Sequence, residues 1–255
     1  MVKLKMKTLR MEEMNWVDIK EAIENGFKTV VIGVGSTEQH GPHLPTQTDA
    51  LIADGMVNLI VQKLKNALQA QTIKVGCSDH HLSFPGTISL NKSTLKAIAH
   101  DYISSLQKHG FEKIIFIPTH GGNFDPLKEV VEEAQNRYSK IKIIAFTDII
   151  AFMEVQDKIA AELNITAEEA GAHAGEAETS EVLALAEDLV KRERFQPGYV
   201  GKLGEKEVEM LYKEGMPSLT KTGVIGDPTK ASKNNGKIYI EKMVEFLTES
   251  IKKHI

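Results

Sequence analysis

Three things are scarce in this sequence, and each scarcity argues against a class of protein. The single cysteine, Cys77, cannot form an internal disulfide, so the chain gains nothing from an oxidising compartment. No apolar run approaches the roughly 20 residues of a membrane span, and none follows Met1 as a secretory signal requires. The net charge of -4 provides no electrostatic footprint for nucleic acid or an anionic membrane. We therefore expect a cytoplasmic protein that binds neither.

The pattern of apolar residues predicts an α/β fold. With 255 residues and 42% hydrophobic residues, the chain is long enough for one sizeable core, so we expect a single domain over residues 1–255. Short apolar runs alternate with amphipathic stretches, which is typical of βα units and a mostly parallel sheet. We expect strands at 28–34, 73–76, 113–118 and 141–146, and helices at 15–26, 49–70, 93–109, 125–138, 175–190 and from 234 onward. Residues 196–231 are expected to be loop with one short helix. The prediction is a three-layer αβα sandwich.

The first chemistry-bearing cluster leaves the first predicted strand and runs to the next predicted helix. Glu38 and His40, two residues apart in loop backbone, can point the same way, and Asp49 returns at the start of the helix. Two carboxylates and an imidazole suit Zn, Mn or Fe(II), and a carboxylate can bridge two ions. The alternative interpretation is that Asp49 caps its helix and the histidine is merely exposed.

The second cluster directly follows the strand predicted at 113–118. It contains His120, Gly121, Gly122 and Asn123. The glycines would let backbone N–H groups approach a bound oxyanion, which makes the residues after His120 candidate substrate contacts. An ordinary strand-to-helix turn with Asn123 as N-cap is the alternative. In a parallel sheet the ligand crevice lies beyond the carboxyl ends of the strands, so both clusters should open onto one crevice.

The third cluster comprises His173, Glu176 and Glu178 at the start of a predicted helix. At 3.6 residues per turn the two glutamates lie roughly 200° apart, so at most one should face a site. The other is explained by favourable charge at a helix N-terminus.

Two further features have weaker readings. His80 and His81 lie in a loop near the expected crevice, where substrate contact is one interpretation and a solvated loop is the other. Gly33 and Gly35 after a strand resemble the first two glycines of a dinucleotide-binding loop. The third glycine of that fingerprint would fall at position 38, where this chain has Glu38, whose carboxylate would repel a pyrophosphate. A nucleotide-binding module of Rossmann type is therefore the first rival reading.

Taken together, the clusters resemble the creatininase (creatinine amidohydrolase) family. The resemblance rests on GSTEQHGPHLPTQTD at 35–49, HGGN at 120–123, HAGEAETS at 173–180 and TGVIGDPTKAS at 222–232. It implies a three-layer αβα fold, a centre of two divalent ions (Zn, Mn or Fe), and a homo-oligomer, commonly a hexamer built as a trimer of dimers. Four residues match ligand positions of the family, namely Glu38, His40, Asp49 and His120. The resemblance also implies that Asp49 bridges the ions and that His173 is catalytic.

One departure from the family pattern bears on the substrate. Enzymes that act on creatinine have Tyr and then a ligand Glu after the histidine that matches His120, whereas this chain has Gly121 and Gly122. One ion would lose its carboxylate, and we expect Glu178 to supply it because Glu178 keeps the family's spacing from His173. Creatinine hydrolases also use tryptophans near the substrate, but Trp16 is the only tryptophan and lies outside every motif.

These observations predict a metal-dependent hydrolase of a non-peptide C–N bond in a small-molecule amide, such as a cyclic amide or formamide. Two cations would lower the pKa of a water molecule towards about 7. Hydroxide would attack the carbonyl carbon, Gly121 and Gly122 would stabilise the oxyanion, and His173 would protonate the leaving nitrogen. A catalytically inactive member kept as a structural oligomer is the second rival reading, although such a protein has no reason to keep four ligands.

Overall fold

The fold is built on four parallel strands, seen in a computed structural model that describes residues 6–254. The sheet has the order β2-β1-β3-β4, with β1 at Thr29–Val34, β2 at Ala67–Gln69, β3 at Lys113–Pro118 and β4 at Lys142–Ala145. Strands β1 and β3 run in register from Thr29↔Lys113 to Val34↔Pro118. Their carboxyl ends therefore meet at one edge of the sheet, as predicted. Residues 1–5, where a secretory signal would begin, lie outside the described residues.

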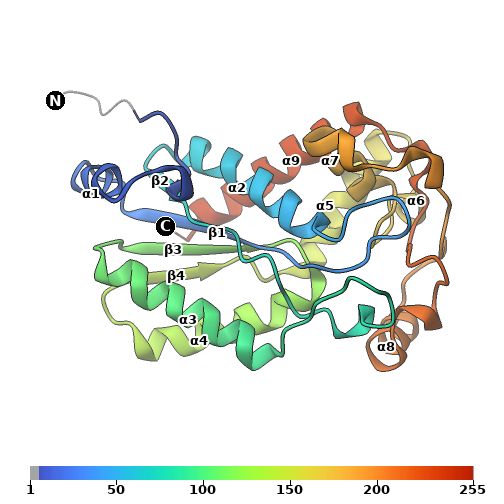
Figure 1. The fold of residues 1–255 in the computed structure, drawn as a ribbon, viewed down its shortest axis with the longest axis horizontal. Coiled ribbons are helices and arrows are strands. Elements are labelled where there is room, and N and C mark those ends of the chain that lie inside the picture. Colours follow the sequence, from blue (N-terminus) through green and yellow to red (C-terminus); the bar gives the residue numbers. More distant parts are fainter. Residues whose placement is uncertain (1–5, 255) are drawn as a thin grey trace.

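Helices cover both faces of this sheet, which confirms the three-layer prediction (Figure 1). One face carries α2 (Thr48–Leu64), α5 (Ile149–Glu162), α7 (Glu176–Ala186) and α9 (Lys233–Lys252). The other carries α3 (Lys92–Lys108) and α4 (Phe124–Arg137), with α1 (Trp16–Glu24) at the end of the sheet opposite the candidate site. The short helices α6 (Ala167–Ala170) and α8 (Glu205–Glu214) lie near the carboxyl edge.

Alternation along the strands divides the core into two clusters. Val31 and Ile115 pack with α2 and α9, whereas Val30, Ile32 and Ile114 pack with α3 and α4. Successive side chains of a strand point to opposite faces, so a sheet covered on both faces needs apolar residues at every position. This is why β1 and the KIIFIP run of β3 stand out in the sequence as unbroken apolar stretches.

Two expected elements are wrong in their bounds. The helix expected at 49–70 ends at Leu64, because Lys65 adopts a left-handed φ of 66° and turns the chain back. The next residues form the edge strand β2. The strand expected at 73–76 is reduced to a single bridge between Ile73 and Val34. The prediction also missed α5 and α6, while α8 is the one short helix expected within 196–231.

Within residues 6–254, none of the helices combines the length and apolarity needed to cross a membrane.

Candidate metal centre

The candidate site lies where β1 and β3 end. Glu38 and His40 stand in the loop that follows β1, Asp49 lies in the first turn of α2, and His120 follows β3 by two residues. All four side chains are buried, with 0% exposure for Glu38 and His40, 2% for Asp49 and 5% for His120. The structure thus brings together the four residues that the first two sequence clusters singled out.

These side chains form two groups that share Asp49. In the first group His120 Nδ1 lies 3.2 Å from Glu38 Oε2 and 3.5 Å from Asp49 Oδ2. In the second, His40 Nε2 lies 3.2 Å from Asp49 Oδ1 and 3.7 Å from Glu178 Oε2. Each group offers an imidazole nitrogen and two carboxylate oxygens, a donor set suited to Zn, Mn or Fe(II).

Three carboxylate oxygens of the site have no hydrogen-bond partner among the described residues. They are both side-chain oxygens of Glu38 and Oδ2 of Asp49. Burying a carboxylate without a hydrogen bond or counter-charge costs several kcal/mol, so buried charges are ordinarily paired or coordinate metals. Two of these oxygens, Glu38 Oε2 and Asp49 Oδ2, lie 3.2 and 3.5 Å from His120 Nδ1, and the third, Glu38 Oε1, lies near His81 and His173. The residues present therefore fit divalent cations.

The histidines of the two groups are held in their charged form by these carboxylates. Burial alone would lower the pKa of His40, but Asp49 and Glu178 outweigh it and raise this pKa to about 10. The pKa of His120 rises to about 9 because Glu38 and Asp49 outweigh burial in the same way. Burial raises the pKa of Glu178 to about 7. Cation binding must displace protons from these imidazoles, because only neutral imidazole ligates a metal.

His173 joins the site from the segment that precedes α7. Its ring lies 4.2 Å from that of His40, and its Nδ1 lies 3.5 Å from Glu38 Oε1. Its other nitrogen, Nε2, lies 2.7 Å from the backbone oxygen of Gln39. A carbonyl oxygen only accepts, so Nε2 carries the hydrogen and Nδ1 is the free basic nitrogen.

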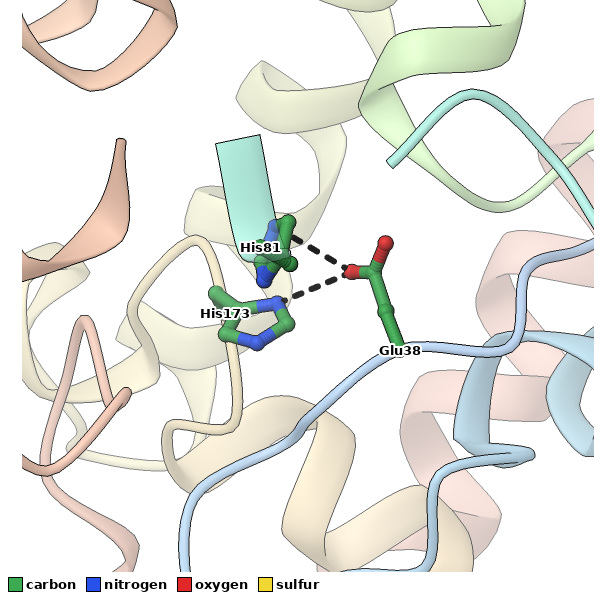
Figure 2. Close-up of side chains that lie close together, drawn as sticks. All are labelled: Glu38, His81 and His173. Atoms are coloured by element: carbon green, nitrogen blue, oxygen red, sulfur yellow. Dashed lines mark ion pairs between the residues drawn. The ribbon is translucent and has the colours of Figure 1, made fainter. Parts of the chain in front are cut away.

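His81 belongs to the site as well. The sequence alone did not decide whether it contacts substrate or lies in a solvated loop. It ends the short 3₁₀ helix Asp79–His81, is 2% exposed, and places Nε2 3.4 Å from Glu38 Oε1 (Figure 2). Burial lowers its pKa to about 2, so the ring is neutral. Three groups within the described residues have metal-ligand spacing: Glu38, His81 and His173; His40, His173 and Glu178; and Glu38, His40 and Asp49.

The two glycines after His120 have different surroundings. A Cβ at Gly122 would lie 2.1 Å from the backbone oxygen of Cys77, so this backbone excludes any side chain there. A Cβ at Gly121 would meet nothing closer than Ile149 and Tyr212, both at 3.7 Å. Position 122 therefore leaves no room for a carboxylate ligand, whereas a Cβ at position 121 would make only ordinary van der Waals contacts.

Asn123 is buried, and its side chain holds loops together. Its amide nitrogen donates to the backbone oxygens of Val34 and Gly35, at 3.2 and 2.9 Å. Its amide oxygen accepts from Cys77 N. It occupies the N-cap position of α4 without a capping hydrogen bond from its side chain. With both amide hydrogens engaged, Asn123 positions the ends of β1 and the Cys77 loop, which differs from the substrate contact expected from the sequence.

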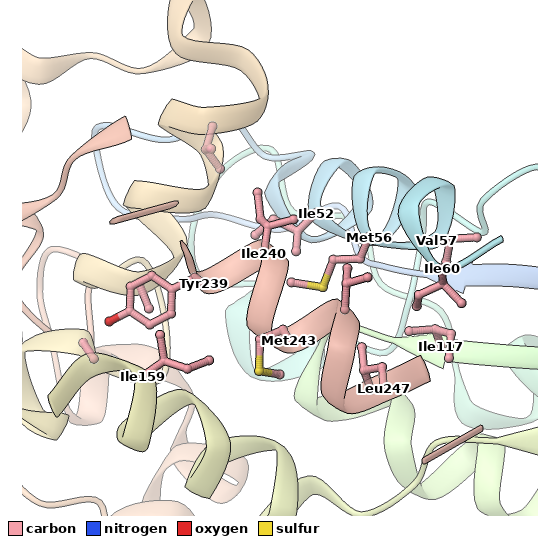
Figure 3. Close-up of a cluster of buried hydrophobic side chains, with 14 of the residues drawn as sticks. Ile52, Met56, Val57, Ile60, Ile117, Ile159, Tyr239, Ile240, Met243 and Leu247 are labelled. Atoms are coloured by element: carbon pink, nitrogen blue, oxygen red, sulfur yellow. The ribbon is translucent and has the colours of Figure 1, made fainter. Parts of the chain in front are cut away.

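The two glutamates of α7 point in different directions, as their helical spacing predicts. Glu178 faces His40, whereas Glu176 is fully buried against α9. Glu176 accepts hydrogen bonds from Ser180, Asn235 and Tyr239, at 2.8 Å each. Tyr239 lies in the apolar core beside Ile240 and Ile159 (Figure 3). The sequence suggested that Glu176 contributes mainly charge at the helix N-terminus. In the structure its carboxylate also joins α7 to α9 through the hydrogen bonds with Asn235 and Tyr239.

Gly33 and Gly35, which suggested a dinucleotide loop, are explained by packing. A Cβ at Gly35 would lie 2.4 Å from the backbone of Ala50, and one at Gly33 would lie 3.0 Å from Ala53 Cβ. Both glycines let β1 and its following loop approach α2. Where a dinucleotide-binding loop would have its third glycine, this chain has Glu38, which is buried among histidines. The glycine pattern therefore does not indicate a nucleotide site.

Comparisons with known proteins match nearly the whole chain. The profile of the creatininase family, described as creatinine amidohydrolase, matches residues 12–251. The mycofactocin precursor peptide peptidase of Mycolicibacterium smegmatis is 30% identical over 229 residues, covering 88% of this chain and 84% of its own. The creatinine amidohydrolase of Pseudomonas putida is 24% identical over 260 residues, covering 96% and 97%. A solved structure described as "Creatininase Mn" superposes with a TM-score of 0.79 at 24% identity, covering 97% of this chain and 98% of that one.

Proposed function

Because the chain belongs to the creatininase family, we propose that it hydrolyses the C–N bond of an amide at a centre of two divalent metal ions. The observation that carries this proposal is the set of three buried carboxylate oxygens, on Glu38 and Asp49, that have no hydrogen-bond partner within residues 6–254. Relatives named as hydrolases of creatinine and of a precursor peptide support an amide as the substrate class.

We assign the ligands from the two groups that share Asp49. Glu38, Asp49 and His120 would hold one ion, and His40, Asp49 and Glu178 the other. Glu178 takes the place of a carboxylate that position 122 has no room for. Zn, Mn and Fe(II) all accept this nitrogen and oxygen set.

The ions would supply Lewis-acid chemistry, lowering the pKa of a water molecule towards about 7. The chain's own residues orient the substrate and move the proton. His173 Nε2 is tied to the backbone oxygen of Gln39, so His173 Nδ1 would accept a proton from the attacking water and pass it to the leaving nitrogen, a role typically worth about 10²–10⁴-fold. The backbone N–H groups of Gly121 and Gly122 would stabilise the oxyanion.

The test of this function combines metal analysis with a substrate screen. The purified protein should bind up to two divalent ions per chain and release amine or carboxylate from one class of cyclic amides, formamides, carbamoyl compounds or short peptides. A chain that binds the ions but hydrolyses none of these would favour the inactive structural oligomer. A chain that binds no divalent ion would remove the basis of the proposal.

Creatinine should be a poor substrate, at least tenfold below the best amide in the screen. Position 122 has no room for the carboxylate found there in creatinine hydrolases, and the only tryptophan, Trp16, is 74% exposed on α1, at the opposite end of the sheet. Steady-state kinetics provide the check. A kcat/KM for creatinine of about 10⁴ M⁻¹s⁻¹ or more, the low end of ordinary enzymes, would contradict this expectation.

Metal affinity should rise with pH across the neutral range. In the metal-free protein His40 and His120 are protonated below their raised pKa values of about 10 and about 9. Each proton that a metal displaces makes the affinity about tenfold higher per pH unit below these values. Competition with a chelator between about pH 6 and pH 8 measures the slope. An affinity that stays flat over this range would show that neither histidine is a ligand.

We also propose a homo-oligomer, as the family resemblance implies, with a hexamer as the expected form. Analytical ultracentrifugation measures the assembly directly. Sedimentation as a monomer at micromolar concentration would contradict it.

A further inference from the structure

Gln39 stands between two candidate ligands in the chain, but its side chain contacts histidines. Its amide nitrogen lies 3.0 Å from His81 Nδ1, 3.0 Å from His173 Nε2 and 3.1 Å from the backbone oxygen of Gly223. Its amide oxygen accepts a hydrogen bond from Gly41 N at 2.9 Å. The residue is only 6% exposed, so these contacts replace water.

The two backbone partners fix which way the amide points. Gly223 offers only an oxygen, which must face the NH₂ group, and Gly41 offers only an N–H, which must face the amide oxygen. Exchanging oxygen and nitrogen would turn both contacts into repulsions between like groups. Buried polar groups are costly to leave unpaired, so these two backbone contacts determine the orientation of the amide.

With the amide fixed, the proton positions of both histidines follow. His173 Nε2 carries a hydrogen because it donates to the backbone carbonyl oxygen of Gln39 at 2.7 Å. It therefore has no lone pair for the Gln39 amide, whose two hydrogens go to Gly223 and to His81 Nδ1. A nitrogen that accepts carries no hydrogen, so neutral His81 holds its proton on Nε2.

We propose that Gln39 fixes the His81 ring with its Nε2–H directed toward Glu38, so that the group formed by Glu38, His81 and His173 is not a third metal site. The protonated Nε2 of His81 and the bare Nδ1 of His173 flank the same oxygen, Glu38 Oε1, at 3.4 and 3.5 Å (Figure 2). A metal at His81 Nε2 would need the proton moved to Nδ1, where the Gln39 N–H opposes it. His81 is thus a positioning residue for Glu38: its N–H attracts the carboxylate across 3.4 Å, and outer groups of this kind commonly orient a ligating carboxylate.

The contact between Gln39 and Gly223 also explains part of the motif at 222–232. Gly223 has a φ of +79°, and a Cβ there would lie 2.0 Å from the amide oxygen of Gln39. A side chain at this position would push Gln39 out of place. The glycine therefore provides both the room and the carbonyl oxygen that set the amide.

Nitrogen NMR of histidine-labelled protein tests the proton positions directly, in the metal-free and the Zn²⁺-loaded protein. Unprotonated and protonated imidazole nitrogens resonate far apart, and His81→Asn and His173→Asn assign the signals. Both rings should carry their proton on Nε2. In Gln39→Glu, His81 should move its proton to Nδ1 or become doubly protonated. His173 should not change, because its partner is a backbone oxygen.

Gln39→Met covers the case in which a buried glutamate disturbs folding, since it removes the donor without adding charge and should leave the His81 tautomer mixed. The matched control is Gln69→Met, which removes a buried glutamine that bonds to Asp54 on α2. It should leave both histidine signals unchanged. A wild-type His81 protonated on Nδ1, or a His81 signal that neither Gln39 variant alters, would overturn the proposal.

Metal content and kinetics provide a second test, which rests on the proposed function. His81→Asn should keep both ions, with activity reduced about 10–100-fold, the usual effect of losing an outer contact at a metal site. Loss of an ion would instead make His81 a ligand and overturn the inference. The two failures are separable: a protein that hydrolyses no amide refutes the function and leaves the NMR result standing, whereas an active protein with His81 protonated on Nδ1 refutes only this inference.

Discussion

Replacing Asp49 by alanine should remove both metal ions and abolish hydrolysis. Asp49 is the one side chain common to the two ligand groups that we propose, with Oδ1 facing His40 and Oδ2 facing His120. Losing an outer hydrogen bond already costs about 10–100-fold in metal affinity, so losing a bridging ligand should cost more than about 100-fold for each ion. Elemental analysis after dialysis measures the loss.

Thermal melts show whether the Asp49→Ala protein is folded. Wild type should gain stability with metal, by about 2.7 kcal/mol when free metal is 100 times Kd, and the variant should gain none. Asp54→Ala is the matched control on the same helix, since Asp54 binds Arg10 on the outside of the fold at 2.8 Å. This control should keep both ions. Unchanged metal content in Asp49→Ala would contradict the bridging assignment.

The second large effect separates the two glutamates of α7. Glu178→Gln should lower metal occupancy and activity together, because a neutral amide is a much poorer ligand than a carboxylate. Glu176→Gln should keep its metal and lose about 1–3 kcal/mol of stability. The amide NH₂ that replaces one oxygen would confront a donor among Ser180, Asn235 and Tyr239.

Metal titrations and thermal melts of the two glutamate variants give opposite signatures. Glu178→Gln should melt near the metal-free wild type, and Glu176→Gln should melt lower while binding metal normally. The reverse pattern, with metal lost only in Glu176→Gln, would transfer the ligand role to Glu176. Such a result would also require α7 to rotate away from its packing on α9.

Local sequence patterns predicted the parts of this fold that depend on local forces. The run at 113–118 predicted the bounds of β3 because, after Lys113, every residue of this doubly covered strand is apolar. The candidate ligands in the loops could be singled out because they follow such strands, and parallel strands end at one edge of a sheet. The opposite directions of Glu176 and Glu178 follow from helical geometry alone.

The missed features depend on contacts between distant parts of the chain. Strand β2 continues an apolar helical pattern, and its assignment needs the left-handed turn at Lys65 and pairing with β1. His81 lies in a loop without periodicity, so only its approach to Glu38 identifies it. Gln39 has no chemistry of its own, and its role needs partners as far along the chain as Gly223.

Anomalous diffraction from crystals of the Mn²⁺- or Zn²⁺-loaded protein tests the central claim most directly. The account predicts two peaks per chain, both in contact with Asp49, one beside Glu38 and His120 and the other beside His40 and Glu178. It also predicts no third peak between Glu38 and His81. A single peak, or a pair of peaks that leaves Asp49 unbound, would contradict the two-ion centre on which the proposed function rests.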